Sequence, residues 1–142
     1  MMPEEARRRF QAEPVARLAT ADPEGRPHIV PMVFAVLGDT VYSAVDSKPK
    51  RTTALRRLSN VTANPQVAVL ADRYDDDWRR LWWVRAEGTG RVLEDTTEAE
   101  AARALDALAE RYAQYREERP AGPLLAIDVS RWSGWAASAS QP

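Results

Sequence analysis

Residues 17–34 read RLATADPEGRPHIVPMVF, two apolar runs separated by a turn signal. Asp22-Pro23-Glu24-Gly25 places Asp, Pro and Gly at the positions that a type I turn favours. The run before the turn, Val15 to Thr20, predicts one strand, and the run after it, His28 to Leu37, predicts another. The second run is apolar at successive positions, which is typical of a strand buried on both faces. The segment therefore predicts an antiparallel hairpin inside a barrel, or beneath a ligand or partner.

The remaining patterns extend this hairpin into a mostly β chain with helices. Thr40 to Val45 continues the antiparallel meander, and residues 97–115 give the clearest helix, with Thr97 and Glu100 spaced as a capping box. In the strand predicted for residues 81–93, Gly88 and Gly90 indicate a bulge, a bend or a close backbone approach. A small antiparallel barrel with helices at its ends accounts for this order. The sequence predicts six strands and three helices in all. The elements not yet named are strands at 66–71 and 124–137 and helices at 3–11 and 52–60.

Length and composition limit the kind of protein. The 142 residues predict a single domain over residues 1–142, and a core that relies heavily on alanine predicts burial in a subunit interface. The chain has no Cys, which excludes disulfides and thiolate metal sites. A formal net charge of −1 argues against a nucleic-acid partner. Since no apolar run is long enough to cross a membrane and the first residues lack a signal-peptide pattern, we expect a cytoplasmic protein without a membrane partner.

Side chains suited to catalysis or metal binding are scarce. His28 is the single histidine, and no G-x-S-x-G elbow accompanies it. The acidic residues between Asp72 and Asp77 lack the spacing of a calcium loop and predict a solvated loop. Neither a Walker A motif nor a G-x-G-x-x-G motif is present. The sequence therefore predicts no metal site and assigns no catalytic residue.

A basic segment is the strongest candidate for ligand binding. Both lysines of the chain, Lys48 and Lys50, lie in SKPKRTT at residues 47–53, directly before the helix predicted for 52–60. The free N–H groups at a helix N-terminus attract anions, so three cations beside it predict a phosphate-binding turn. A solvated basic turn, with Thr52 as an ordinary helix cap, explains the same residues equally well.

Pro31 and the tryptophans also admit two explanations. A proline within a strand lacks a ladder N–H, so Pro31 indicates either an edge strand or a bound ligand beside it. The five Trp residues supply apolar area with a polar N–H, which suits a subunit interface or an aromatic ligand pocket.

Four segments in order resemble the split-barrel flavin and deazaflavin oxidoreductases. These include pyridoxamine 5′-phosphate oxidase-like proteins and their coenzyme F420-dependent actinobacterial relatives. The first segment, R-L-A-T-x-D-x-x-G-x-P-H-x-V-P-M-V-F at 17–34, is similar to the opening hairpin of that family. The second segment, SKPKRTTALRRL at 47–58, resembles the phosphate-binding turn and following helix of that family. The third and fourth segments, NPQVAVLAD at 64–72 and WVRAEGTGRVL at 83–93, resemble its next two strands.

The resemblance implies a fold and a set of site residues. The expected fold is mostly β with peripheral helices, a six-stranded antiparallel split barrel that forms a homodimer with cofactor sites at the interface. Carried over by position, the cofactor phosphate would be held by Lys48, Lys50, Arg51 and Thr52. The ring system would be lined by Val30, Pro31 and Met32, with Ser43 and Ala44 beside it. Trp83 matches a position near the polar edge of the ring, and the partner subunit would contribute Trp132 or Trp135.

The resemblance also implies an activity. The patterns H-x-V-P-M-V-F and S-K-P-K-R-T are most similar to the deazaflavin-using branch, which predicts a coenzyme F420-dependent oxidoreductase that passes a hydride to an unidentified small acceptor. Two alternatives stay open: an FMN-dependent oxidase or reductase, and a non-catalytic protein that binds or carries F420. The C-terminal arginine segment of pyridoxamine oxidases is not visible, which argues against vitamin B6 oxidation as the main activity.

Overall fold

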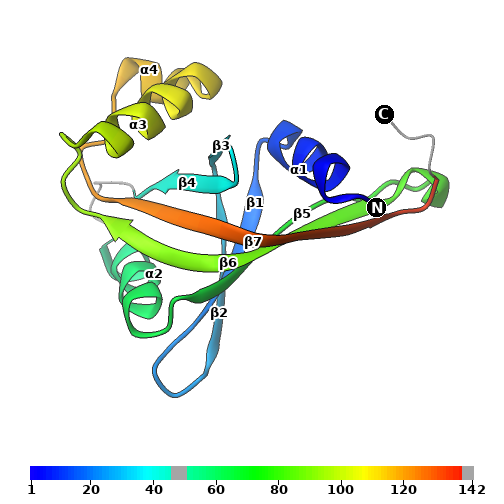
Figure 1. Cartoon of the computed structure of the whole chain (residues 1–142), viewed down its shortest axis with the longest axis horizontal. Helices are drawn as coiled ribbons and strands as arrows, with labels where there is room; N and C mark the ends of the chain where they lie inside the picture. The colour runs from blue at the N-terminus through cyan, green and yellow to red at the C-terminus, as the bar shows by residue number, and fades with distance from the viewer. Residues whose placement is uncertain (46–50, 139–142) are drawn as a thin grey trace.

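The computed structural model describes residues 1–45 and 51–138, apart from the side chains of residues 51–55. Figure 1 shows the helices and strands with the labels used below. In chain order they are α1 (Pro3–Ala12), β1 (Ala16–Ala21), β2 (Pro27–Met32), β3 (Ala35–Leu37), β4 (Thr40–Ala44), α2 (Arg51–Ala63), β5 (Gln66–Arg73), the 3₁₀ turn η1 (Trp78–Arg80), β6 (Trp82–Leu93), α3 (Ala99–Arg111), α4 (Ala113–Glu117) and β7 (Leu124–Ala136).

The strands form one antiparallel sheet in the order β2-β1-β5-β6-β7-β4-β3. The two outer strands, β2 and β3, follow each other along the chain but do not pair with each other, so the barrel is not closed. The expected antiparallel, mostly β architecture with peripheral helices is confirmed. The edge position of β2 also accounts for Pro31, because an edge strand tolerates a residue without an N–H.

The prediction of one strand from His28 to Leu37 is wrong, and this raises the strand number from the expected six to seven. The sheet hydrogen bonding stops at Val33 and Phe34, where side chains bind the backbone instead. Ser43 Oγ donates to the Val33 carbonyl oxygen at 2.8 Å, and Arg111 Nη1 donates to the Phe34 carbonyl oxygen at 2.7 Å. Because these side chains satisfy the backbone, the chain can leave β2 and begin β3 without a ladder partner.

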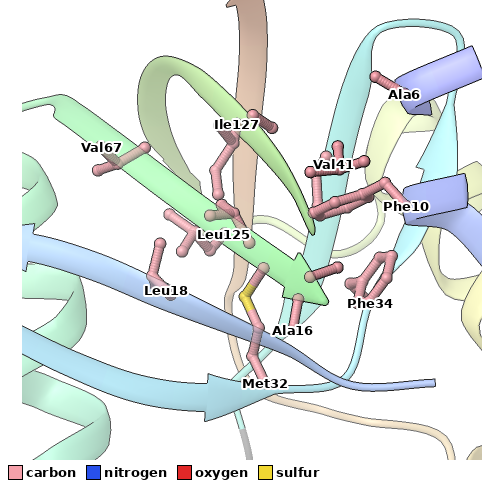
Figure 2. Close-up of a cluster of buried hydrophobic side chains, with 14 of the residues drawn as sticks. Ala6, Phe10, Ala16, Leu18, Met32, Phe34, Val41, Val67, Leu125 and Ile127 are labelled. Carbon is pink, nitrogen blue, oxygen red and sulfur yellow. The ribbon is translucent and has the colours of Figure 1, made fainter. Parts of the chain in front are cut away.

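The larger hydrophobic core lies on the inner face of the sheet and includes α1. Phe10 of α1 is fully buried, with its ring centroid 4.7 Å from that of Phe34 and 5.3 Å from that of Trp132. Figure 2 shows Phe10 and Phe34 together with residues from several strands. A second cluster joins α3 to β4 and the start of β7 through Tyr42, Ala44, Ala104, Leu105, Leu108, Leu124 and Ala126. The two clusters therefore lie on opposite faces of the sheet.

The long strands β6 and β7 contain the irregularity that the glycines indicate. Their register shifts between Glu87 and Gly88. A Cβ added at Gly88 would lie 2.2 Å from the Asp128 carbonyl oxygen, and one at Gly90 would lie 2.8 Å from a methyl group of Val61. Both the bulge and the close approach are confirmed, and Gly90 lets α2 pack closely against β6.

The helix predicted for residues 97–115 is interrupted at Tyr112, whose backbone is extended with φ −121° and ψ 115°. The predicted capping box is also wrong. Glu98 is the N-cap residue, while Glu100 accepts hydrogen bonds from Arg91 and Tyr42 rather than turning back to the helix end. The predicted apolar stripe is confirmed, since Ala101, Leu105 and Leu108 are buried and Tyr112 and Tyr115 pack against them. Within the described residues, no helix combines the length and apolar character needed to cross a membrane.

Candidate functional site

Helix α2 is fixed against the β1–β2 hairpin by residues of its second half. Val61 is buried in the inner-face core. Asn60 is only 3% exposed and donates its amide N–H to the Thr20 hydroxyl at 3.1 Å. Buried polar side chains of this kind hold an element in one orientation, because the partner group would otherwise remain unsatisfied. The face of α2 that carries Arg56 and Asn60, four residues apart, is thus turned toward the hairpin.

A polar pocket of about 450 Å³ lies between α2 and the hairpin. Arg56 and Asn60 line it from the helix, and Asp22, Arg26 and His28 line it from the hairpin, together with Pro27. His28 stands opposite Thr20 in the β1–β2 ladder. Its Nδ1 atom is shielded from solvent and has no hydrogen-bond partner in the described part of the chain. The pocket therefore combines a fixed amide, an unsatisfied imidazole nitrogen and cationic groups.

The turn on one side of the pocket is held by its own charges. The Asp22 carboxylate accepts hydrogen bonds from the backbone N–H groups of Glu24 and Arg26 and from Arg26 Nε, at 2.8–2.9 Å. These bonds, that of the Arg26 backbone above all, lower the pKa of Asp22. Arg26 also donates to Glu24. The predicted turn is confirmed by the bond from Gly25 N–H to the Asp22 carbonyl oxygen at 2.9 Å, and Gly25 has a positive φ of 81°.

Two adjacent arginines of α2 have no anionic partner among the described residues. Arg56 is exposed and takes part in no ion pair there. Arg57 is half-buried, and its Nε atom is shielded from solvent without a hydrogen-bond partner in the same part of the chain. Burial lowers the pKa of the Arg57 guanidinium, against a smaller opposing effect of Tyr115. A partly buried cation without a counter-charge is costly, so its environment suits an anionic group.

The basic turn that the sequence singles out adjoins this helix. Lys48 and Lys50 lie outside the described residues. Arg51 is the first residue of α2 and Thr52 the second, while their side chains also fall outside the description. The helix expected over residues 52–60 is confirmed and extends to Ala63.

The three residues expected to line the ring system point in different directions. Met32 is 5% exposed and its side chain belongs to the inner-face core, into which it points in Figure 2. Val30 shares that face and packs against the same cluster, whereas Pro31, between them, is exposed on the outer face. Only the backbone of this segment and the Pro31 ring are available to a ligand on the outer face.

The two β4 residues of the expected site are buried. Ser43 is 1% exposed, with its hydroxyl bound to the Val33 carbonyl oxygen. Ala44 is 5% exposed and belongs to the cluster beneath α3. Both side chains are thus buried, and the Ser43 hydroxyl holds the backbone between β2 and β3 that neighbours Pro31.

Two of the three tryptophans of interest share one environment. Trp83 and Trp135 are directly paired across β6 and β7 on the outer face, and the Arg85 guanidinium lies 5.3 Å from the centroid of the Trp83 ring. Trp132 instead packs on Phe10 in the core, and its Nε1 donates to Asp39 at 3.0 Å. Trp135 is 49% exposed, which leaves it available to a partner.

Trp83 and Trp135 belong to an outer sheet surface that the helices leave open. This surface, which we call the open face, consists of Trp83, Trp135 and two rows of cross-strand neighbours, and neither buried cluster includes any of these residues. Ile29 is 65% exposed there, while Glu87 Oε2 and Ser133 Oγ are shielded from solvent without hydrogen-bond partners in the described chain. The rows are Ile29-Ala19-Ala68-Glu87-Arg131 and Pro31-Arg17-Leu70-Arg85-Ser133.

Sequence reasoning missed the pair Thr20–Asn60, which positions α2 over the hairpin. The available signal was the spacing of Arg56 and Asn60, which places both on one helix face. It could not reveal which strand that face contacts, because the sequence contains no information on the distance between residues 20 and 60 in the fold.

The model of one protein family, described as pyridoxamine 5′-phosphate oxidase, matches residues 2–136. Solved structures with the same fold include a conserved hypothetical protein of Mycobacterium tuberculosis, 23% identical, with a TM-score of 0.71 over 96% of this chain and 86% of that one. A FAD-binding protein of Mesorhizobium loti is 21% identical, with a TM-score of 0.71 over 94% of each chain. The heme storage protein HutZ of Vibrio cholerae is 15% identical, with a TM-score of 0.71 over 96% of this chain and 95% of its own. No match was found among curated proteins.

Proposed function

Because the chain belongs to the pyridoxamine 5′-phosphate oxidase family, we propose that it is an oxidoreductase that uses coenzyme F420 to reduce a small organic acceptor. The observation that carries the proposal is Arg57, a partly buried guanidinium of α2 that lacks a counter-charge in the described chain. This helix begins within the basic sequence segment at residues 47–53. A cofactor with a phosphate and further carboxylates supplies the anions that such a helix requires.

The residue types of the basic segment and of α2 suit a phosphorylated cofactor. In the proposed complex, Lys48, Lys50, Arg51 and Thr52 hold the phosphate at the start of α2. Val30, Pro31 and Met32 provide the backbone edge beside the ring, supported by the buried residues Ser43 and Ala44. A reduced deazaflavin supplies a hydride when it is bound. The protein positions the ring and shields it from water, and no side chain of the described chain is assigned as a general acid.

The open face supports a homodimer as the active form. Ile29, Pro31, Leu70, Trp83 and Trp135 give it an apolar centre, with charged residues of both signs among them. The shielded oxygen atoms of Glu87 and Ser133 accept no hydrogen bond within the described part of this subunit, although Glu87 Oε2 lies 3.8 Å from Arg85 Nε and 4.0 Å from Arg131 Nε, and a second copy would supply hydrogen-bond donors. In that dimer Trp83 and Trp135 lie at the interface. The partner subunit contributes its own Trp135 toward the ring of the cofactor.

A fluorescence titration of the purified protein with F420 and with FMN tests the proposal. We expect micromolar binding of F420 in preference to FMN, and a loss of at least about tenfold in affinity in the variants Lys50→Ala/Arg51→Ala and Arg57→Met. Arg8→Gln, at an exposed position of α1, is the matched control and retains full affinity. Reduction of a nitroaromatic or enone acceptor by reduced F420 then tests turnover.

Each other outcome of the titration favours a different function. Preferential binding of FMN, with a yellow protein that reacts with oxygen, would favour an FMN-dependent oxidase or reductase. Tight F420 binding without turnover on any acceptor would favour a carrier. If neither cofactor binds, the proposal is wrong and the fold serves another ligand.

A further inference from the structure

The polar pocket between α2 and the β1–β2 hairpin is lined by residues from the middle of α2. Arg56 lies five residues after the start of α2, about 7 Å further along the helix axis at 1.5 Å per residue. The pocket of about 450 Å³ exceeds the size of a water site, and the lining residues that the structure describes are polar or charged apart from Pro27. This lining excludes an apolar ligand and favours a hydrophilic one.

Arg56 is the guanidinium at the pocket that stands outside the ion pairs of the hairpin. Asp22 and Arg26 form an ion pair at 2.9 Å, and Glu24 pairs with the same guanidinium at 3.2 Å, so both hairpin carboxylates are already engaged by Arg26. Arg56 faces the pocket from α2 and has no ion pair among the described residues. The guanidinium of Arg56 is a planar group that binds carboxylates and phosphates with two parallel hydrogen bonds.

Two further groups at the pocket are prepared for a polar ligand. Asn60 is 3% exposed and is held by its bond to Thr20, so its amide has a fixed orientation. Beside Thr20 in the ladder, His28 presents a ring whose Nδ1 is shielded and unpartnered within the described chain. An unsatisfied buried ring nitrogen is unfavourable unless a ligand or a water completes it.

We propose that this pocket is a second anion-binding site, in which Arg56, His28 and Asn60 receive a carboxylate or phosphate group. The group has two possible sources with the same chemistry: the distal end of a cofactor whose first phosphate lies at residues 48–52, or a separate acidic substrate. The first source rests on the proposed function and the second does not.

Isothermal titration calorimetry with defined probes distinguishes these sources. Inorganic phosphate and glutarate test a free anion. FMN against FAD, and the tail-free deazaflavin against F420 with its glutamate tail, test the end of a cofactor. The variants are Arg56→Gln and His28→Gln, with Arg8→Gln as the exposed control on α1. Circular dichroism establishes that each variant is folded before binding is measured.

We expect Arg56→Gln to weaken the binding of one class of probe, either the free anions or the extended cofactors, about tenfold. We expect His28→Gln to weaken the same binding severalfold and Arg8→Gln to leave it unchanged. A loss of affinity for phosphate or glutarate alone assigns the site to a separate anion. A loss of affinity for FAD or for F420 with its glutamate tail, with unchanged affinity for FMN and for the tail-free deazaflavin, assigns the site to the distal end of the cofactor. If every affinity in both variants stays within twofold of the parent, the second site is refuted while the proposed function stands. If no cofactor binds but a free anion does, the proposed function fails and the second site stands.

Discussion

Arg91 on β6 binds two carboxylates at once, one on α3 and one on β7. Its guanidinium donates to Glu100 at 2.5 and 2.8 Å and to Asp128 at 2.7 and 3.1 Å. Tyr42 donates its hydroxyl to Glu100 at 2.7 Å from β4. These bonds, chiefly that from Arg91, lower the pKa of Glu100 to about 2. The network thus ties the start of α3 to three strands through one ionised carboxylate.

Glu100→Gln is expected to reduce the free energy of unfolding by about 1–2 kcal/mol at pH 7, because charge-assisted hydrogen bonds are lost. A carboxylate whose pKa is lower in the folded chain stabilises the fold above its ordinary pKa of about 4.5. That contribution disappears as the pH falls toward 2. Urea unfolding between pH 7 and pH 3 should therefore show a smaller difference between variant and parent at the acidic end.

Glu110→Gln, at an exposed position of the same helix, is the control for this experiment and should match the parent at both pH values. A deficit of Glu100→Gln that is equally large at pH 3 would contradict the electrostatic explanation and indicate lost packing instead.

The break between β2 and β3 is created by a helix distant in sequence. The Tyr112 hydroxyl accepts the Phe34 N–H at 3.1 Å and lies within hydrogen-bond distance of the carbonyl oxygens of Pro14 and Phe34, at 2.8 and 3.0 Å. Arg111, beside it, donates to the Phe34 and Glu13 carbonyl oxygens and lies 4.9 Å from the Phe34 ring centroid. The end of α3 therefore takes the place of a strand partner for this part of the chain.

Tyr112→Phe removes the hydroxyl and leaves the Phe34 N–H without an acceptor, so we expect a loss of about 1–2 kcal/mol in unfolding free energy. Hydrogen exchange of the Phe34 amide should accelerate more than that of amides within β6. Tyr74→Phe provides the control, because Tyr74 is 73% exposed. Unchanged protection of Phe34 in Tyr112→Phe would show that this hydroxyl does not hold the break.

Local patterns predict the elements of this chain better than its interruptions. The turn at Asp22–Gly25, the bulge near Gly88 and the apolar stripe of α3 all depend on neighbouring residues, and the sequence predicts them correctly. The breaks at Val33–Phe34 and at Tyr112 arise from mutual contacts across some 78 positions, which periodicity cannot reveal. The same limit applies to the site: the helix after the basic turn is predicted, whereas its contact with the hairpin through Asn60 and Thr20 is not.

At the scale of the whole molecule, the sheet is covered unevenly. Its inner face is filled by α1 and part of α2, and α3 covers the outer side of β4 and the start of β7. As Figure 1 shows, α3 and α4 lie over one end of the sheet, far from the other ends of β6 and β7 that carry Trp83 and Trp135. The open face therefore combines exposed apolar side chains with shielded oxygen atoms that accept no hydrogen bond within the described chain, which is the expected character of a surface completed by a second copy.

Ile29→Asp tests this arrangement, because it places a charge at the most exposed apolar position of the open face without touching the core. We expect the variant to remain folded and its dimer dissociation constant to rise by more than about tenfold, since a desolvated, unpaired carboxylate is costly in an interface. Light scattering after size exclusion measures the mass, and Leu37→Asp on β3 is the control, because Leu37 is also exposed but lies at the other edge of the sheet. Loss of the dimer only in Ile29→Asp, with weaker cofactor binding, would place the second copy on the open face. A parent that is monomeric, or an Ile29→Asp variant that is still dimeric, would require that Trp83 and Pro31 meet the cofactor without a partner subunit.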